Sequence, residues 1–489
     1  MGLHMAKFFL SQWCFWATVM TTVLSLLLIV LALKSLNQSR EKDINSGRVL
    51  SADTMAVSII VPAYNEQAII CNTVQALLRL QHDAFEIIVV NDGSTDQTLG
   101  VLRSALHLRE IPMVPSTSLP HKRIDRLFDS RLDPRIRVVD KLHGGKFDAL
   151  NAGISISKYP WFCCVDADTI PMQDALSEMM TQMQRHPSAI GVAGQVRVGN
   201  IRHTSGRLLV MAQVVEYVRA FVIERIGWSE FNALVIVPGA FSLFSIQAVC
   251  EVGGYSSGMP TEDVELVIKL HRHNLRRRRK YRVLYAPKAI AWTEAPKNLI
   301  SLTRQRERWY RGLWAAIYRH RSTLLHPRYG VIGLFVLPYL LLFELLRPAF
   351  VVFTFMASVL CLNSEIGTAL LRLFLLNFVG QCLLSSAMVL IDWSNFRQCY
   401  TPLSVLWHTL ASIVIERSIY SFLLAVFKIQ AFIMFVLPFV RESGKWQTVT
   451  RVGFKLPSSE MSVAKNCGNK RHHAACLSTT VSVTGGALE

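Results

Sequence analysis

The sequence predicts an α/β fold, in which helices cover both faces of a mostly parallel sheet, joined to a region of membrane-spanning helices. Between residues 51 and 325, short β-rich runs alternate with helical patterns, which is typical of parallel sheets. No charged residue occurs from Phe8 to Leu33, and the last third of the chain is again strongly apolar. The chain has 489 residues, of which 51% are hydrophobic, so it is long enough for more than one domain.

The N-terminal apolar stretch, Phe8 to Leu33, exceeds the roughly 20 residues that cross a bilayer. It has little positive charge before it and no small-residue cleavage site, so we interpret it as a retained anchor. The positive-inside rule then places the following domain in the cytoplasm. The charges behind this interpretation are Lys7 before the stretch and Lys34, Arg40, Lys42 and Arg48 after it.

The middle of the chain is predicted to contain four buried strands and three helices. Its apolar runs are nearly continuous, as in strands that are buried on both faces. The strands are expected at 57–63, 86–92, 135–140 and 161–168. The helices are expected at 66–80, 96–108 and 146–157. Residues 112–134 are rich in proline and are expected to form a surface loop.

The C-terminal third is predicted to contain three spans. Glu344 and Arg347 would lie on one helix face, where they either pair inside the membrane or end an interfacial helix before Pro348. The last span is long enough for an interfacial helix plus a span, or for two short spans. The candidate spans are 329–362, 373–391 and 402–440. The predicted divisions are an anchor and linker (1–50), a cytoplasmic domain with an interfacial helix (51–325), a membrane region (326–441) and a disordered tail (442–489).

The net charge of +18 does not predict nucleic-acid binding. Much of this charge flanks apolar spans, where it orients the chain and meets anionic lipid. The run from Arg276 to Arg282 could bind an acidic ligand, but a solvated or lipid-facing surface is the simpler interpretation. Ten scattered cysteines indicate reduced thiols, and the tail does not have a standard zinc spacing. The tail residues concerned are Cys467, His472, His473 and Cys476.

Polar residues follow each of the four predicted strands. Ligands bind outside the carboxyl ends of the strands in open α/β sheets, so these residues are expected around one crevice. A lone acidic tip is usually a turn or a helix cap, but four polar tips, including a Gly-Gly-Lys loop, predict a binding site. The tips are residues 64–66, 91–94, 143–146 and 166–168.

Asp166 and Asp168 are spaced by one residue, so on a strand they would point the same way. Two carboxylates of this kind suit Mg²⁺ or Mn²⁺, which bind through one or two carboxylates and substrate phosphates. Lys146, after two glycines, is a second candidate partner for phosphate. Its loop lacks the first glycine and the final Ser/Thr of a Walker A sequence, so nucleotide hydrolysis by that route is not expected.

Two further motifs precede the membrane region. In "TEDVE", Thr261 is a candidate helix cap, and an acid at such a junction could also act as a general base. In "RQRERWYRG", Gln305, Arg308 and Trp309 share one helix face. That face suits a sugar ring and a diphosphate, but periodicity alone favours an amphipathic helix at the membrane surface.

Taken in order, "VPAYNE", "VVNDGSTD", "GGKFDALNAG", "DAD", "TED" and "QRERW" resemble the motifs of membrane-embedded family 2 glycosyltransferases. This family includes cellulose, hyaluronan, chitin-oligosaccharide and poly-N-acetylglucosamine synthases. The resemblance covers residues 55 to 315 and is nearest to the bacterial poly-N-acetylglucosamine type. Each motif is weak to moderate alone, but the ordered set is highly specific.

The resemblance implies a GT-A fold and a UDP-sugar donor. It implies nucleotide contacts from Asn65, Glu66, Asp92, Lys146 and Asp166, and metal and diphosphate binding by Asp166 and Asp168. Asp263 would be the catalytic base. The implied acceptor and pyrophosphate residues are Gly239, Phe241, Glu262, Gln305, Arg308 and Trp309. Gln213, Glu216 and Tyr217 also match a family pattern, without an assigned role.

The implied reaction is processive, inverting transfer of a sugar such as N-acetylglucosamine from UDP to a growing polysaccharide, which then crosses the membrane. The implied location is the bacterial inner membrane, and an accessory membrane subunit is compatible with this scheme. Phe147, the long proline-rich loop and the single N-terminal span depart from the family pattern. No cyclic-dinucleotide receptor sequence is evident after Val440, which disfavours cellulose synthesis. The alternatives are a non-processive transferase acting on a lipid or glycan, and a non-catalytic membrane partner.

Overall fold

The computed structural model describes residues 2–45, 55–112, 119–201, 207–346, 365–400 and 402–437, together with residues 348, 352, 355 and 356. The predicted disordered tail and its cysteines and histidines lie outside the described residues.

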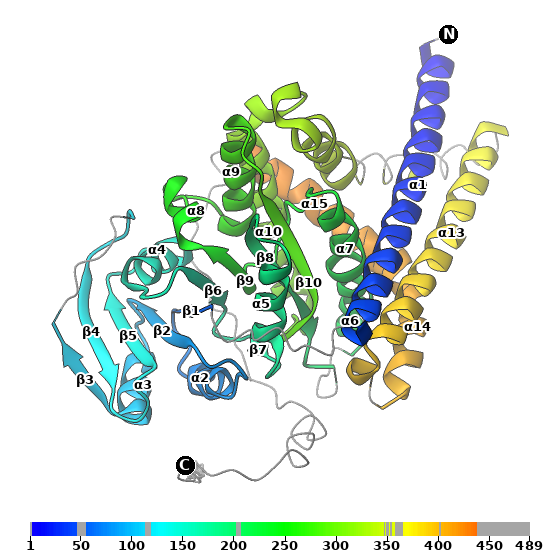
Figure 1. Cartoon of the computed structure of the whole chain (residues 1–489). Coiled ribbons are helices and arrows are strands. Elements are labelled where there is room, and N and C mark those ends of the chain that lie inside the picture. Colours follow the sequence, from blue (N-terminus) through cyan, green and yellow to red (C-terminus); the bar gives the residue numbers. More distant parts are fainter. Residues whose placement is uncertain are drawn as a thin grey trace, which may run out of the picture. The chain divides into compact units, whose positions relative to one another are not determined.

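The centre of the described chain is one mixed sheet of ten strands, in the order β3-β4-β5-β2-β1-β6-β9-β8-β10-β7 (Figure 1). Four neighbouring strands, β5, β2, β1 and β6, are parallel. The strands are β1 (Val57–Ala63), β2 (Phe85–Asp92), β3 (Leu108–Ile111), β4 (Ile124–Ser130), β5 (Ile136–Lys141), β6 (Trp161–Val165), β7 (Ile170–Pro171), β8 (Ala189–Val198), β9 (Phe241–Ser245) and β10 (Arg282–Thr293). All four predicted strands are present, although β6 ends three residues early.

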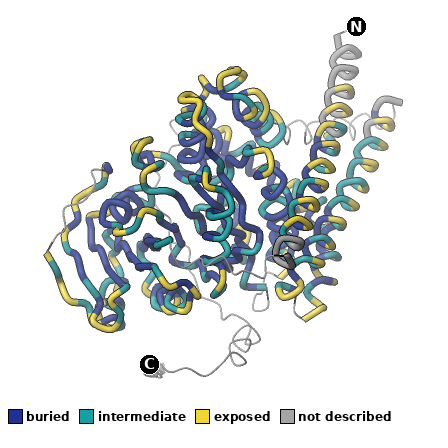
Figure 2. The backbone as a smooth tube through the Cα atoms, viewed as in Figure 1, coloured by how far each residue is buried: buried dark blue, intermediate teal, exposed yellow. Residues whose placement is uncertain are grey.

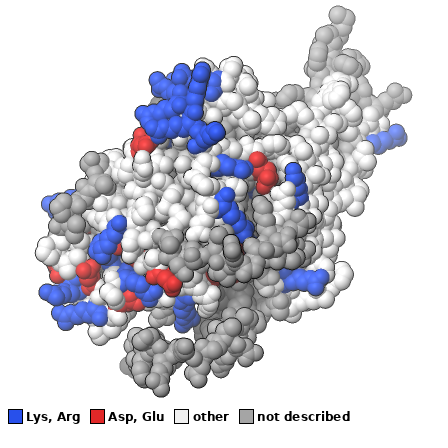
Figure 3. Space-filling model, in the orientation of Figure 1, with Lys and Arg blue, Asp and Glu red and all other residues white. Residues whose placement is uncertain are grey.

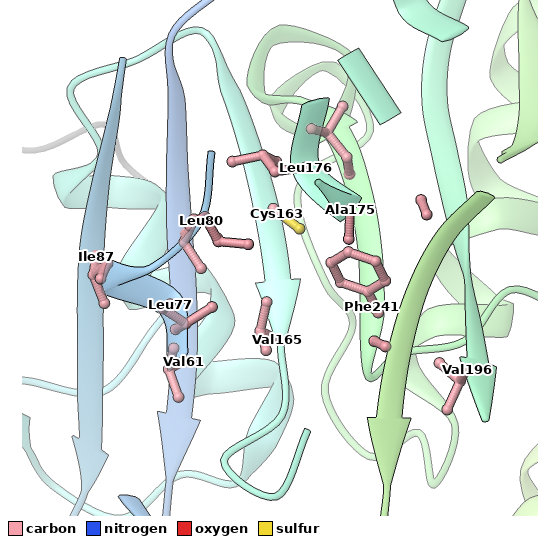
Figure 4. Close-up of a cluster of buried hydrophobic side chains, with 14 of the residues drawn as sticks. Val61, Leu77, Leu80, Ile87, Cys163, Val165, Ala175, Leu176, Val196 and Phe241 are labelled. Carbon is pink, nitrogen blue, oxygen red and sulfur yellow. The ribbon is translucent and has the colours of Figure 1, made fainter. Parts of the chain in front are cut away.

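Helices cover both faces of the sheet. Successive residues of a strand point to opposite faces, so the apolar strands present side chains to the helices on each side. Ile59 belongs to the core cluster shared with α2 and α5, whereas Ile60 contacts α4 at Gly153. Figure 4 shows the first of these layers, with Leu77 of α2 and Ala175 of α5 over Val61 and Val165. The helices between β1 and β8 are α2 (Ile70–Leu78), α3 (Thr98–Leu106), α4 (Lys146–Ile156) and α5 (Ala175–Arg185).

The predicted surface loop at 112–134 is wrong in part, because it contains strand β4. β4 pairs antiparallel with β5 and with the short strand β3, and so extends the sheet at its edge. Ile124, Leu127 and Phe128 are buried, and the prolines flank this strand instead of interrupting it. The loop prediction rested on the proline content, and it therefore missed a short amphipathic strand.

The second half of the domain consists mainly of helices, with β9 and β10 between them. The π-helical segment η2 directly follows α6, and α10 contains the "RQRERWYRG" sequence. Figure 2 shows buried backbone through the sheet and more exposed backbone at the β3–β4 edge. The elements are α6 (Arg207–Glu216), η2 (Tyr217–Ile223), α7 (Glu224–Glu230), α8 (Ile246–Glu251), α9 (Glu262–Arg276) and α10 (Leu299–Arg319), followed by two 3-10 turns, η3 (Arg321–Thr323) and η4 (Pro327–Tyr329).

Lys and Arg side chains gather over the end of α9 on the face shown in Figure 3. Arg276 through Lys280 are exposed, and Arg277 and Arg279 pair with Glu251. The basic run is therefore a solvated surface in this structure, as the simpler interpretation of the sequence expected.

Three helices among the described residues are long and apolar enough to cross a membrane: Val19–Ser39, Gly367–Asn395 and Ser404–Val436. The first lies in α1 (Gly2–Asn45) and the second in α13 (Glu365–Asn395). Large apolar side chains on them point outward, including Val30, Leu376 and Leu383. A lipid environment explains such exposure, since soluble surfaces rarely carry large apolar patches.

The last predicted span is a single continuous helical stretch, not two short spans. It consists of α14 (Ser404–Ile415), the π-helical segment η8 (Glu416–Tyr420) and α15 (Ser421–Val436). The first C-terminal candidate is described only as a shorter apolar helix, Ile332–Leu346, made of η5 (Ile332–Val336), α11 (Leu337–Tyr339) and η6 (Leu340–Leu346). Most of its remaining residues, and Arg347, lie outside the described residues. Glu344 instead accepts a hydrogen bond from Lys428 of α15 at 2.6 Å.

The membrane helices pack directly on the α/β part. In α7, Gly227 lies so close to α1 that an added Cβ would be 2.7 Å from the Leu28 side chain. At the end of β8, Arg197 donates two hydrogen bonds to Asp392 of α13, at 2.7 and 3.0 Å. Tyr400 donates a third to the same carboxylate at 2.5 Å. Close contacts therefore join the α/β part to two of the candidate spans, α7 to α1 and β8 to α13.

Candidate active site

The carboxyl ends of β5, β2, β1 and β6 meet at one edge of the sheet, as the sequence predicted. Asp92, at the end of β2, is wholly buried. Its carboxylate accepts hydrogen bonds from Lys141 Nζ at 2.6 Å and from the Gly145 amide at 2.7 Å. Lys141 also pairs with Asp148 at the start of α4. Asp92 therefore holds the Gly-Gly-Lys loop in place, and a direct contact with a nucleotide stays a prediction.

Asn65 and Glu66 form the turn between β1 and α2. Asn65 has a φ of 57°, a left-handed conformation that asparagine tolerates better than most residues. Its side-chain oxygen accepts the amide hydrogen of Thr95 at 2.8 Å, and the Glu66 amide donates to Thr98 Oγ1. These bonds tie the β1 and β2 tips together and explain why α2 starts at Ile70, later than predicted.

Lys146 connects the Gly-Gly-Lys loop to two acidic motifs. Its Nζ lies 2.6 Å from Asp166 Oδ1 and 3.4 Å from Glu262 Oε1. Burial alone would lower the pKa of Lys146, but the charges of Asp166 and Glu262 outweigh burial and raise it above its usual value. The lysine is therefore a permanent cation at the site. Burial raises the pKa of Glu262, and the Lys146 charge offsets part of this rise.

The two aspartates of "DAD" reach the site from a turn and not from a strand. β6 ends at Val165, and Asp166 and Asp168 lie in the turn before β7. Ala167 between them is buried, while both aspartates line the same cavity. The expectation that both aspartate side chains point to the same site is supported, but they do so from a turn and not from a strand.

The chemistry of this pair fits a hard divalent cation that is held jointly with a ligand. Within the part of the chain that the structure describes, no group of three or more His, Cys, Asp or Glu side chains could hold a metal ion. Asp166 already has a cation partner in Lys146. Asp166 and Asp168 would thus supply at most two ligands, and diphosphate oxygens and water would supply the rest, as Mg²⁺ accepts.

Asp263 is oriented by backbone amides. Its Oδ2 accepts the Gly239 amide hydrogen and its Oδ1 that of Val264, both at 2.8 Å. A Cβ on Gly239 would lie 2.6 Å from Oδ2, so this close approach requires glycine. Thr261 occupies the N-cap position of α9 without a side-chain capping bond. The side-chain cap expected from the sequence at Thr261 is therefore absent.

Helix α10 brings the third motif to the same place. Gln305, Arg308 and Trp309 all line the cavity, as their shared helix face predicted. Tyr310 is buried and Trp309 packs against the core, so a purely membrane-surface helix does not describe this segment. Helix α10 approaches the "TED" loop closely at Gly312, where an added Cβ would overlap the Thr261 side chain.

One cavity of about 1030 Å³ joins these motifs. Its walls include Lys146, both aspartates of "DAD", Gly239, Glu262 and Asp263, together with the α10 residues. It continues along the membrane helices past both charged and aromatic side chains. The lining residues there include Phe343, Glu344, Phe378, Arg417, Phe422 and Lys428.

Some predicted site residues lie elsewhere. Asn65, Glu66 and Asp92 do not line this cavity. Phe241 is only 1% exposed and packs in the hydrophobic core (Figure 4). Arg306 was not predicted as a site residue; it is wholly buried, and its Nη2 lies 2.6 Å from Glu216 Oε2. Only its place inside the "QRERW" motif could have drawn attention to it.

Two family models match the chain. The model described as Glycosyl transferase family 2 matches residues 58–244. The model described as Glycosyl transferase family group 2 matches residues 161–363. Both include the "DAD" turn, and the second continues through "TED" and "QRERW" into the membrane region.

Curated relatives include two staphylococcal proteins named poly-beta-1,6-N-acetyl-D-glucosamine synthase. The protein from Staphylococcus epidermidis is 27% identical over 277 residues, which is 56% of this chain and 59% of the relative. The protein from Staphylococcus aureus (strain COL) is 29% identical over 289 residues, which is 59% of this chain and 60% of the relative. The chain thus spans about three fifths of the length of these relatives.

Among solved structures, the mannosyltransferase PcManGT from Pyrobaculum calidifontis, in complex with GDP-Man and Mn²⁺, aligns with a TM-score of 0.47 and 18% identity. The alignment covers 81% of this chain and 98% of that one. The two family models cover the motifs that line the cavity. The synthase relatives and the candidate membrane spans are consistent with these matches. Residues 58–363 of this chain are therefore similar to family 2 glycosyltransferases, and three described helices could cross a membrane.

Proposed function

We propose that the chain is a processive, inverting β-glycosyltransferase that extends a polysaccharide from a UDP-sugar donor and passes the product through the membrane. The proposed sugar is N-acetylglucosamine, because the curated relatives are poly-beta-1,6-N-acetyl-D-glucosamine synthases. The observation that carries the proposal is the single cavity, which runs from the "DAD" turn past Asp263 to the membrane helices.

In the proposed reaction, Asp263 removes a proton from the acceptor hydroxyl. The resulting oxygen attacks the anomeric carbon of the donor from the face opposite UDP, so an α-linked donor gives a β-glycoside. Lys146 and Arg308, both on the cavity wall, would stabilise the diphosphate as it leaves. A bound divalent cation would neutralise part of that charge, held by Asp166 and Asp168. Asn65, Glu66 and Asp92 stay candidates for the nucleotide end.

The proposed acceptor face is the wall formed by α10. Trp309 offers an aromatic surface to a sugar ring, and Gln305 offers an amide. Gly239 and Glu262 also line the cavity, and both contact Lys146 of the donor side. An acceptor held here would have its reactive end near Asp263 and its other end toward the membrane helices, which is the arrangement that repeated addition requires.

The proposed location is the bacterial inner membrane, with the catalytic domain in the cytoplasm. Basic residues follow the apolar part of α1 and support this orientation: Lys34, Arg40 and Lys42. Accessibility of an introduced cysteine in the α/β domain to an impermeant thiol reagent, in intact and in opened cells, tests it.

The deciding experiment uses the full chain in nanodiscs with Mg²⁺ or Mn²⁺ and a panel of UDP-sugars, with GDP-mannose as a contrasting donor. UDP release and product length are measured together. Long product from UDP-N-acetylglucosamine is the expected result. Single-sugar products would instead favour the non-processive alternative, and absence of UDP release with every donor would favour a non-catalytic partner.

Asp263→Asn serves as the matched variant. It preserves the shape of the side chain but removes the base, so we expect transfer to fall by about a hundredfold or more, while the Kd for UDP changes little. Titration of UDP into the variant and single-turnover transfer assays measure the two quantities. Normal turnover in Asp263→Asn would remove this residue as the base.

A further inference from the structure

The last membrane helix contains a π-helical turn where it meets the catalytic domain. This turn, η8, lies between α14 and α15 and contacts α6. π-helical turns interrupt regular helices and often mark functional sites. On this turn, Glu416 Oε1 lies 3.7 Å from Arg219 Nη2 of η2. Tyr420 is the last residue of the turn, and its side chain is buried. The helix is therefore in direct polar contact with the domain that holds the active site.

Tyr420 takes part in a buried cluster with Glu216 and Arg306. Arg306 Nη2 lies 2.6 Å from Glu216 Oε2 and 3.1 Å from the Tyr420 hydroxyl oxygen. The Tyr420 hydroxyl also donates to Glu216 Oε2 at 2.6 Å. These three residues, which we call the Glu216 cluster, come from α6, α10 and the last membrane helix. All are nearly inaccessible to solvent, so each hydrogen bond depends strongly on the others.

The Glu216 cluster touches two residues of the proposed acceptor face. The Arg306 guanidinium carbon lies 4.1 Å from the centre of the Trp309 ring, which is within the range of a cation–π contact. Its Nη1 donates to Gln305 Oε1 at 3.1 Å. Both Trp309 and Gln305 line the cavity. Arg306 therefore supports from beneath the two side chains that would meet an acceptor sugar.

We propose that Glu216, Arg306 and Tyr420 are positioning residues for the acceptor, through which the last membrane helix sets the affinity of the catalytic face for the glycan. The inference rests on the proposed function. Lys146 of the proposed donor side pairs instead with Asp166 and Glu262, which are not members of this cluster. A change in the cluster should therefore alter acceptor binding more than donor binding.

Tyr420→Phe is the sharpest variant because it removes one hydroxyl and keeps the ring. Loss of a hydrogen bond to a buried charged group should weaken acceptor binding by about tenfold. The Kd for UDP is expected to stay within about twofold. With the weaker hold on the glycan, products should be shorter. Arg306→Lys retains a positive charge but not the planar guanidinium group. Its loss of acceptor affinity should therefore be smaller than that of Arg306→Met, but not zero.

Tyr400→Phe is the matched control. Tyr400 is also buried, and its hydroxyl donates to a buried carboxylate, Asp392, beside a membrane helix. It does not line the cavity. A loss of stability alone would affect both variants alike, whereas the proposal predicts weaker acceptor binding only in Tyr420→Phe.

The test measures the Kd for a β-1,6-linked N-acetylglucosamine pentasaccharide by calorimetry, with the full chain in nanodiscs, and the acceptor KM by UDP release. Selective weakening in Tyr420→Phe supports the proposal. An unchanged Kd in Tyr420→Phe, or an equal change in Tyr400→Phe, overturns it. If the unaltered protein adds only one sugar, the proposed processivity fails, but the Kd comparison still decides the role of the Glu216 cluster.

Discussion

At the scale of single residues, the site depends on side chains whose oxygen and nitrogen atoms are held by the backbone or by a buried partner. Gly239 and Val264 orient both oxygens of Asp263, and Lys141 and Gly145 hold Asp92. Preorganised groups of this kind need little rearrangement during reaction, which is the usual source of electrostatic catalysis.

His271 in α9 gives a residue-scale prediction on pH. The side chain is fully buried, where Nε2 contacts the Leu234 carbonyl oxygen and Nδ1 the Tyr281 hydroxyl. Burial lowers the pKa of His271 to about 4. Below the ordinary pKa of about 6.5, the unfolded chain binds a proton that the folded chain does not. The stability that this residue contributes is therefore present above pH 6.5 and is lost as the pH falls toward 4.

We expect this loss to reach about 2 kcal/mol by pH 5. Thermal unfolding in detergent at pH 7.5 and pH 5 measures it, with His271→Gln as the comparison. The variant should be less stable at pH 7.5 but should lose less stability on acidification. An identical loss in both proteins would show that His271 does not control this part of the pH dependence.

At the scale of elements, helix α10 links the catalytic domain to the membrane region. It packs on α15, its cavity-facing residues form the proposed acceptor face, and Gly312 allows contact with the "TED" loop. A helix normally gains from alanine in place of glycine by about 1 kcal/mol. At Gly312 the close approach of Thr261 should reverse that sign.

Gly312→Ala is therefore expected to destabilise the protein by about 1–3 kcal/mol and to raise the acceptor KM, because α10 must move away from α9. Gly380→Ala in α13 is the control, since no atom of the described residues lies within 4 Å of an added Cβ there. Unfolding midpoints and acceptor KM values are compared for both variants. If Gly312→Ala were as stable as Gly380→Ala, the tight contact between α10 and the "TED" loop would be refuted.

At the scale of the whole molecule, buried polar contacts join the sheet to the membrane helices. Arg197 and Asp392 form a two-bonded ion pair between β8 and α13. The Asp392 side chain is wholly inaccessible and that of Arg197 is 7% exposed. Removing one member of such a pair is costly, because the remaining charge is buried without a partner and is poorly solvated.

Asp392→Asn should therefore destabilise the protein by about 3 kcal/mol, whereas Arg197→Met combined with Asp392→Leu should recover much of that loss. Thermal unfolding of the three proteins in the same detergent gives the comparison. A double variant that is less stable than Asp392→Asn would contradict this account of the ion pair. UDP affinity should be similar in all three, since neither residue lines the cavity.

Local pattern predicted the elements well where it was unambiguous. The apolar runs of β1, β2 and β5 match the structure closely. The proline-flanked strand β4 was missed because its short amphipathic pattern resembles a loop. The two aspartates of "DAD" were singled out by type and spacing, but their turn geometry and the ion pair of Asp166 with Lys146 depend on residues distant in sequence.

The sequence by itself determined the fold class, the parallel strands with their polar tips, the membrane helices and the family motifs, because each of these depends on neighbouring residues and on hydrophobic periodicity. Only the tertiary structure decided that Asp92 is a buried support, that Phe241 lies in the core, and that Tyr420 of the last membrane helix reaches Glu216 and Arg306. Such contacts join residues up to 204 positions apart, and they follow from how helices and sheet pack together, which no local pattern contains.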